Sequence, residues 1–261
     1  MKLHRIYAIV LRFMYLFRHS LDRLSDAFYW PTLDLLVWGI TSSYFRSYLP
    51  QTSQIVLIIL GGILLWIIVW RGQYEITVSI LEDLWNRNLV NIFVSPLKFS
   101  EWIVSLVTLG VIKAIMSFSF GLLVAFVLYK IKIFSYGFYL IPLSLLLIMT
   151  GWWMGFFIAG LILRYGTKIQ ALAWTAPWII APLSAIYYPV SSLPEWAQTI
   201  ALLIPTSYVF EEAREVIEEG TLDPNKLYIS FLLNAIYIVL SLIFLKKSFN
   251  KVLKIGLVKV Y

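Results

Sequence analysis

Apolar residues dominate this chain in six long runs, each near the length that a helix needs to cross a bilayer. A helix rises about 1.5 Å per residue, so about 20 apolar residues span a hydrocarbon core of about 30 Å. We therefore expect six transmembrane helices, at residues 29–48, 54–70, 102–129, 138–163, 169–187 and 227–245. Pro31 lies near the start of the first run, where proline is tolerated. Pro177 and Pro182 predict a kink in the fifth.

Residues 1–28 show a different pattern, because charged residues interrupt every apolar run. This pattern argues against a signal peptide. On a helical wheel the charged positions share one face, which includes the arginines Arg5, Arg12, Arg18 and Arg23. We expect an interfacial helix in the headgroup plane with these arginines towards anionic lipid. Such a helix either only anchors the N-terminus or takes part in gating, and the sequence leaves both open.

Residues 71–101 are polar and separate the second and third apolar runs. Charged and polar residues alternate there with aliphatic ones, as in an amphipathic helix that lies on a membrane surface or under a docked protein. Ser95 and Pro96 end the pattern, because proline cannot continue the helical hydrogen bonds. A structured polar connection of this kind indicates a docking site for a soluble partner.

Residues 188–225 precede the last apolar run and are too apolar for a free loop. The stretch from Pro189 to Pro205 is too short to cross a bilayer and predicts a short re-entrant helix. Ser192 and Glu195 have the spacing of a capping box, and Pro205 is expected to stop the helix. A second short helix follows and ends at Gly220, with five glutamates facing water: Glu211, Glu212, Glu215, Glu218 and Glu219.

Composition agrees with a membrane location. Apolar residues make up 61% and charged residues 13% of the 261 residues, against about 45–50% and about 25% in soluble domains. The expected fold class is an all-α membrane protein that forms a single domain. With no cysteine and two histidines, disulfides, thiol catalysis and a histidine-ligated metal centre are not expected.

The net charge of +7 follows the positive-inside rule rather than indicating nucleic acid as a partner. If the N-terminus is cytoplasmic, the inner side carries about three times as many Lys and Arg as the outer side. We therefore expect a multi-pass protein of the cell membrane with both termini and residues 71–101 in the cytoplasm.

In two stretches the chain resembles the permease subunits of ABC-2 type exporters. Residues 82–96 (EDLWNRNLVNIFVSP) resemble the coupling region of that family, including its closing Ser-Pro. Residues 188–220 (YPVSSLPEWAQTIALLIPTSYVFEEAREVIEEG) resemble its signature before the last span. The topology also resembles that of the family: an interfacial N-terminal helix, six spans, a cytoplasmic coupling helix and a broken outer segment.

The resemblance implies a transport subunit that is not itself an enzyme. A separate dimeric ATPase would bind ATP and Mg²⁺, and this chain would hold no cofactor, in keeping with its lack of a GxxxxGK[ST] motif. A second permease copy, as a homodimer, would enclose the path, and membrane lipid would surround it. The coupling residues would be Glu82, Asp83, Trp85, Arg87, Asn88 and Pro96. The outer gate would include Pro189, Leu193, Pro194, Trp196 and Pro205.

The substrate stays open between a glycan or lipid-linked glycan, a lipid and an amphipathic drug. Trp152, Trp153, Trp174 and Trp178 either line a path or belong to an interfacial aromatic belt. A secondary transporter or an intramembrane enzyme is the alternative class. The sequence lacks an internal repeat and the common hydrolase and metal motifs.

Two ionisable residues, Asp34 and Lys113, fall inside the predicted spans. An unpaired cation in a bilayer costs roughly 2.5–3.5 kcal/mol on insertion scales. We expect Lys113 to face the interior of the subunit, either paired with Asp34 or in a water-filled vestibule; snorkelling to lipid is the alternative. Gly151 and Gly155 have GxxxG spacing, which favours close helix packing within the subunit over a dimer contact.

Overall fold

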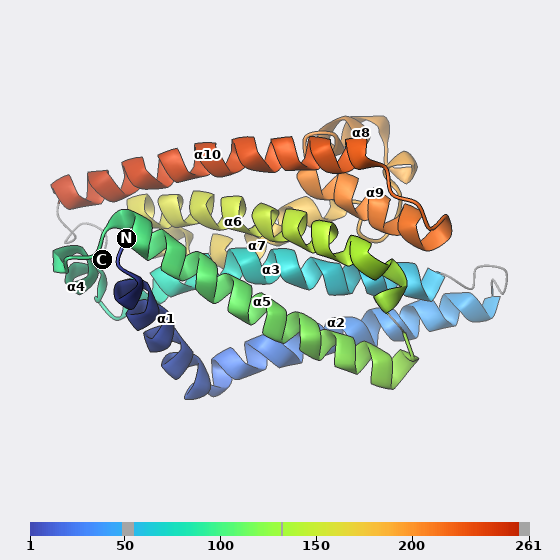
Figure 1. Ribbon diagram of the computed structural model, residues 1–261, viewed down its shortest axis with the longest axis horizontal. Helices are drawn as coiled ribbons and strands as arrows, with labels where there is room; N and C mark the ends of the chain where they lie inside the picture. Colours follow the sequence, from blue (N-terminus) through green and yellow to red (C-terminus); the bar gives the residue numbers. More distant parts are fainter. Residues whose placement is uncertain (49–54, 132, 256–261) are drawn as a thin grey trace.

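The computed structural model describes residues 1–48, 55–131 and 133–255, which form a bundle of helices without a strand in these ranges (Figure 1). The α-helices are α1 Leu3–Arg18, α2 Leu21–Tyr48, α3 Ile55–Trp85, α4 Leu89–Val94, α5 Phe99–Tyr129, α6 Leu140–Tyr165, α7 Leu172–Ile180, α8 Glu195–Ala201, α9 Pro205–Glu218 and α10 Pro224–Ile255. Short 3₁₀ helices are η1 Ile133–Tyr139, η2 Gly166–Ile169, η3 Ala181–Leu183 and η4 Val190–Ser192.

In the described ranges, 4 helical segments are long and apolar enough to cross a membrane: Ile55–Trp85, Phe99–Tyr129, Tyr136–Ile169 and Pro224–Lys254. The all-α membrane class is thereby supported. The predicted span 29–48 forms the later part of α2, which is not among these segments. The predicted span 169–187 is broken, because its apolar helix runs only over Leu172–Leu183 and then turns.

Helix α3 lies at the centre of the bundle, packed against α2 and α5 on one side and α6 on the other (Figure 1). Glycine allows the contact with α6: a Cβ atom on Gly151 would lie 2.6 Å from the carbonyl oxygen of Val69 and 2.9 Å from the Cα of Gly72. Gly155 is similarly close to Ile76, at 2.9 Å. The GxxxG spacing therefore serves packing within the chain, as the sequence favours.

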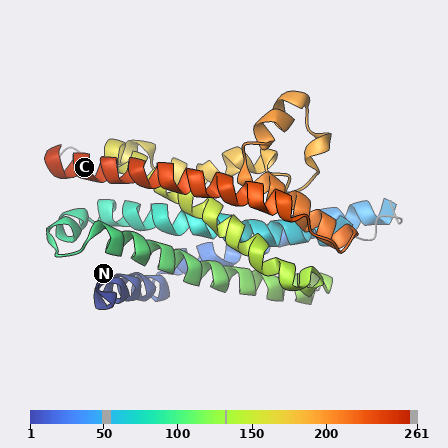
Figure 2. The same cartoon turned by 45° about the horizontal axis from the view of Figure 1, so that its top comes forward.

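The elongated bundle has two different ends (Figures 1 and 2). Helices α1 and α4 and the C-terminal end of α10 gather at one end, which we call the basic end. Helices α8 and α9 gather at the other, where α9 packs against α6 and α10 and the segment that contains α8 projects from the bundle (Figure 2). The lysines and arginines of residues 1–23 lie in or next to α1 or at the start of α2, and those of residues 246–254 belong to the C-terminal part of α10. Both α1 and this part of α10 lie at the basic end (Figure 1).

Two predicted helices differ from the structure. Residues 1–28 form two helices rather than one, because the chain turns at His19 and Ser20 and α2 begins at Leu21. Pro31 therefore lies inside α2 rather than at its start. Residues 71–85 do not form a separate surface helix: α3 continues through them, and Arg71, Glu75 and Asp83 are buried. Each of the three has an ion-pair partner on a neighbouring helix, α1, α2 or α5, so these charges can be buried within a continuous helix.

The segment before α10 contains two short helices, as expected, but its details differ. Pro194 precedes α8 in place of the predicted capping box, and the hydroxyl of Ser192 donates to the carbonyl of Pro189. Pro205 starts α9 rather than stopping α8, a position that needs no backbone N–H. Glu212 is buried rather than facing water.

Candidate functional site

Three arginines of α1 and α2 bind carboxylates on α3 and α5 at the basic end. The pairs are Arg5–Glu101 at 3.3 Å, Arg12–Asp83 at 2.8 Å and Arg23–Glu82 at 2.7 Å. Arg12 bonds both oxygens of its carboxylate through one nitrogen. These contacts fasten the two N-terminal helices to the central helices by charge-assisted hydrogen bonds.

A second group of charges continues this network towards the middle of the molecule. The Lys113 ammonium lies 2.5 Å from a carboxylate oxygen of Glu75 and 4.7 Å from the ring centre of Phe17. Arg71 lies 3.5 Å from Glu75 and 3.7 Å from Asp26, and it also donates to the backbone carbonyl of Asp26. Two cations and two carboxylates therefore balance one another in a buried cluster.

These contacts correct two predictions about charged residues. Arg5, Arg12 and Arg23 bind protein carboxylates instead of facing anionic lipid, whereas Arg18 is exposed. Lys113 faces the interior as expected, with 6% of its surface exposed, but its partner is Glu75 and not Asp34. The predicted docking carboxylates of Glu82 and Asp83 are engaged inside the chain.

The remaining predicted docking residues lie at the tip formed by residues 85–96, between α3 and α5. Trp85 is exposed, donates to the side chain of Gln170 and stacks on Trp174. Arg87 has a φ of 53°, in the left-handed region, which turns the chain after α3. Asn88 donates to Asp83, and the carbonyl of the exposed Pro96 accepts from Arg5.

The predicted outer-gate residues lie at the end opposite the tip. Pro189, Pro194 and Trp196 are exposed, Leu193 is half-buried and Pro205 is buried. Exposed apolar side chains of α8 and the turn after it give this region a surface unlike an ordinary polar loop: Trp196, Ile200, Leu202 and Leu203.

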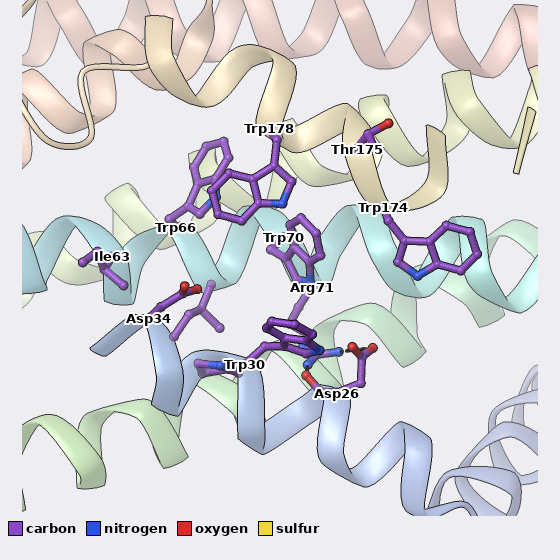
Figure 3. Close-up of a pocket in the computed structure, with 12 residues that line it drawn as sticks. Asp26, Trp30, Asp34, Ile63, Trp66, Trp70, Arg71, Trp174, Thr175 and Trp178 are labelled. Atoms are coloured by element: carbon purple, nitrogen blue, oxygen red, sulfur yellow. Dashed lines mark hydrogen bonds and ion pairs between the residues drawn. The ribbon is translucent and has the colours of Figure 1, made fainter. Parts of the chain in front are cut away.

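A cavity of about 500 Å³ lies between α2, α3 and α7 (Figure 3). We call it the aromatic pocket, and its lining residues are Asp26, Trp30, Pro31, Asp34, Ile63, Trp66, Ile67, Trp70, Arg71, Trp174, Thr175 and Trp178. Trp66 is buried at its floor, whereas Trp30 and Trp178 are 56% and 47% exposed. The pocket therefore opens at a rim of indole rings and has the size of a site for a small organic molecule.

Sequence reasoning missed most of this pocket, although a signal for it exists. Asp26, Trp30 and Asp34 follow one another at intervals of four on α2, and Trp66 and Trp70 do so on α3. Trp174 and Trp178 repeat the spacing on α7. Residues four apart share a helix face, so three helices each direct aromatic rings into one space. Of the four tryptophans considered from the sequence, only Trp174 and Trp178 line this pocket.

Asp34 differs from the other carboxylates named above. It points into the aromatic pocket from α2 (Figure 3), and in the described ranges it forms an ion pair with no lysine or arginine. Arg71 lines the same pocket, but Asp26 and Glu75 already neutralise its charge. The pocket thus carries one uncompensated negative charge among five indole rings.

Glu212, at the end of the bundle that carries α8 and α9, is a buried carboxylate whose surroundings differ from those of Glu75 and Asp34. Glu212 of α9 accepts from the backbone N–H of Asp223 and pairs with Lys226 at 3.1 Å. Desolvation by burial nevertheless raises its pKa above the ordinary value.

The described residues contain no group of three side chains that could hold a metal ion. Among known proteins, no family model matches the chain, and no curated protein is significantly similar to it.

Proposed function

We propose that this chain is the membrane-spanning subunit of an ATP-driven exporter, powered by a separate ATPase that docks at the tip of residues 85–96. In this proposal, the basic end and both termini are cytoplasmic, and the chain lies in the cell membrane. Helix α2 and the broken α7–η3 segment complete six spans with the four long apolar helices. A second copy of the chain faces the first.

The observation that carries the proposal is the length of the α3–α5 hairpin. Each helix has 31 residues, or about 46 Å at 1.5 Å per residue, against a hydrocarbon core of about 30 Å. The polar residues of α3 begin at Arg71, so the surplus length belongs at the end that carries the tip. A tip in water, held rigidly by two helices, is suited to transmit movement from a docked protein.

The surface of the tip supports docking of a protein rather than simple solvation. Val94 is 82% exposed, and Trp85 and Val90 also present apolar surface beyond the apolar part of α3. Exposed apolar groups outside the bilayer commonly mark interaction sites. Because arginines already bind Glu82 and Asp83, contacts with a partner would fall on the apolar and amide side chains instead.

A direct contact joins the tip to the aromatic pocket. The ring of Trp85 stacks on Trp174, with centroids 6.2 Å apart and planes at 14°. Trp174 lines the pocket. A force applied at the tip therefore acts on a wall of the candidate substrate site, as a transport cycle coupled to ATP requires.

The test is the ATPase activity that accompanies the tagged chain when it is purified from its own host's membranes. We expect the wild-type chain to elute with an ATPase that contains a GxxxxGK[ST] motif. Val94→Glu should lose it, because a carboxylate would enter the docking surface. Trp196→Glu, the same type of change at the opposite end, should retain it. A wild-type eluate without ATP hydrolysis, or equal loss in both variants, would contradict the proposal.

A further inference from the structure

We propose that the aromatic pocket binds a lipophilic organic cation, whose positive charge pairs with Asp34 and lies against the indole rings. This names a substrate class for the proposed exporter and thus rests on that function. The relevant observations are the five indoles, the uncompensated carboxylate and the opening of the cavity at an exposed aromatic rim.

The charge balance indicates the sign of the ligand. Around the pocket and the adjoining cluster, the cations are Arg23, Arg71 and Lys113, and the carboxylates are Asp26, Asp34, Glu75 and Glu82. Arg23 pairs with Glu82, and four further groups form the chain of contacts from Asp26 through Arg71 and Glu75 to Lys113. Asp34 takes part in none of these contacts. A cation would supply the missing charge, whereas an anion would add to the excess.

The indole rings favour the same sign. Electron density on the face of an aromatic ring attracts cations, and tryptophan attracts them most strongly. Trp70 and Trp178 meet edge to face at the rim, with centroids 5.8 Å apart. Trp70 also stacks on Tyr74, at 6.2 Å. These contacts fix the rings in place, so a ligand has less ordering of side chains to overcome.

The dimensions of the site require apolar groups on the cation. Asp26 and Asp34 are eight residues apart on α2, or roughly 12 Å along the helix axis. Between them the walls are indole rings, aliphatic side chains and Pro31. A small hydrated cation such as Na⁺ or Ca²⁺ needs several oxygen ligands, which these walls do not offer. Aryl or alkyl groups around a single positive charge fit the lining.

Tetraphenylphosphonium is a suitable probe, because tetraphenylborate has almost the same shape and the opposite charge. Equilibrium dialysis would measure the binding of each to the chain in zwitterionic nanodiscs, with empty nanodiscs subtracted. We expect saturable binding of the phosphonium alone. Asp34→Asn should weaken it roughly tenfold or more, since it removes a partly desolvated opposite charge. Asp34→Glu should weaken it less.

Control variants separate the pocket from general effects. Asp22→Asn removes the same charge from an exposed position on the same helix and should leave the affinity unchanged. Trp178→Leu should weaken binding, whereas Trp196→Leu, an exposed tryptophan on α8, should not. Size-exclusion profiles would establish that each variant is folded.

Several results would overturn the assignment. They are the absence of saturable phosphonium binding to the folded wild-type chain, equal or tighter binding of tetraphenylborate, and an Asp34→Asn affinity equal to that of the wild type. The assay contains neither ATP nor an ATPase. A negative result would therefore contradict the cation site alone, and the proposed exporter function would still be tested by the co-purification of an ATPase.

Discussion

The buried cluster around Glu75 and the aromatic pocket around Asp34 are neighbours, yet the carboxylate is paired with cations in the first and, within the described part of the chain, unpaired in the second. Glu75 is enclosed by Lys113 and Arg71, both within 3.5 Å. Asp34 lines a pocket that holds five indole rings, and in the described ranges it forms no ion pair with a lysine or arginine. The first arrangement fastens helices together, and the second leaves a charge available for a ligand.

This contrast has a physical basis. Removing a charge from water is costly, and a buried ion pair recovers the loss only when its partners are close and well placed. The Glu75 cluster meets that condition with groups from three helices, α2, α3 and α5. The Asp34 carboxylate is left without compensation in the chain alone. Retaining such a group favours a role other than stability.

The largest expected effect comes from breaking the cluster. Lys113→Met leaves Asp26 and Glu75 with only Arg71, so one negative charge stays buried. We expect destabilisation of about 3–5 kcal/mol, the range for a buried pair that loses one partner. Thermal unfolding in detergent and folded yield would measure it.

The rescue variants make this prediction specific. Adding Glu75→Gln to Lys113→Met restores charge balance and should recover most of the stability. Adding Asp34→Asn should recover no more than the effect of Asp34→Asn alone, about 0.5 kcal/mol or less, because Asp34 is not the partner of Lys113. Rescue by Asp34→Asn instead would show that the two sites form a single charge network.

A smaller effect is expected at the pair between Arg12 and Asp83. The side chain of Arg12 is 34% exposed, so water screens the pair, and Asn88 continues to bond Asp83 after its loss. Arg12→Ala should destabilise the chain by about 1 kcal/mol. Proteolysis near His19 should also become faster as α1 loosens. A loss comparable to that of Lys113→Met would contradict this ranking.

Asp34→Asn should act in the opposite direction. Replacing an unpaired carboxylate by an amide of the same shape removes a desolvation penalty, so the apo chain should be equally stable or more stable by about 0.5 kcal/mol. The measurement is again thermal unfolding, with Asp22→Asn as the control. A marked loss of stability would mean that Asp34 has a structural partner.

The smallest effect concerns Glu212, whose pKa is raised by burial. Its folded form holds a proton more tightly than the unfolded chain. Its contribution to stability is therefore complete below the ordinary pKa of 4.5 and declines as the pH rises through the raised value. We expect Glu212→Gln to lose this decline. Thermal unfolding at several pH values above 4.5 would detect it, and parallel curves for the two proteins would contradict it.

The sequence predicts the apolar helices of this molecule better than its polar contacts. Runs such as 102–129 and 138–163 coincide with α5 and α6, because burial in lipid demands continuous apolar length. For residues 71–85 the sequence wrongly predicts a surface helix, because charged residues such as Glu75 and Asp83 are typical of solvent-exposed positions. Their partners, Lys113 and Arg12, lie 38 and 71 residues away along the chain. No local pattern reveals a pairing across such separations.

The aromatic pocket is only partly predictable from the sequence. The spacing of four between Trp66 and Trp70, and between Trp174 and Trp178, is visible in the sequence. That these faces meet one another, and also Asp34, depends on how α2 and α7 pack on α3. The tip differs again: the sequence predicts that Ser95 and Pro96 end one amphipathic helix, whereas in the structure α3 ends at Trp85 and Ser95 follows the separate short helix α4.

The most direct test of the proposed function is site-specific photo-crosslinking from the tip in living cells. A photoreactive amino acid would replace Val94, and a matched variant would carry it at Phe138, which is 90% exposed near the start of α6. We expect the Val94 variant to form a covalent product with an ATPase that contains a GxxxxGK[ST] motif, and the Phe138 variant to form none. An ATPase captured equally from both positions, or from Phe138 alone, would contradict docking at the tip.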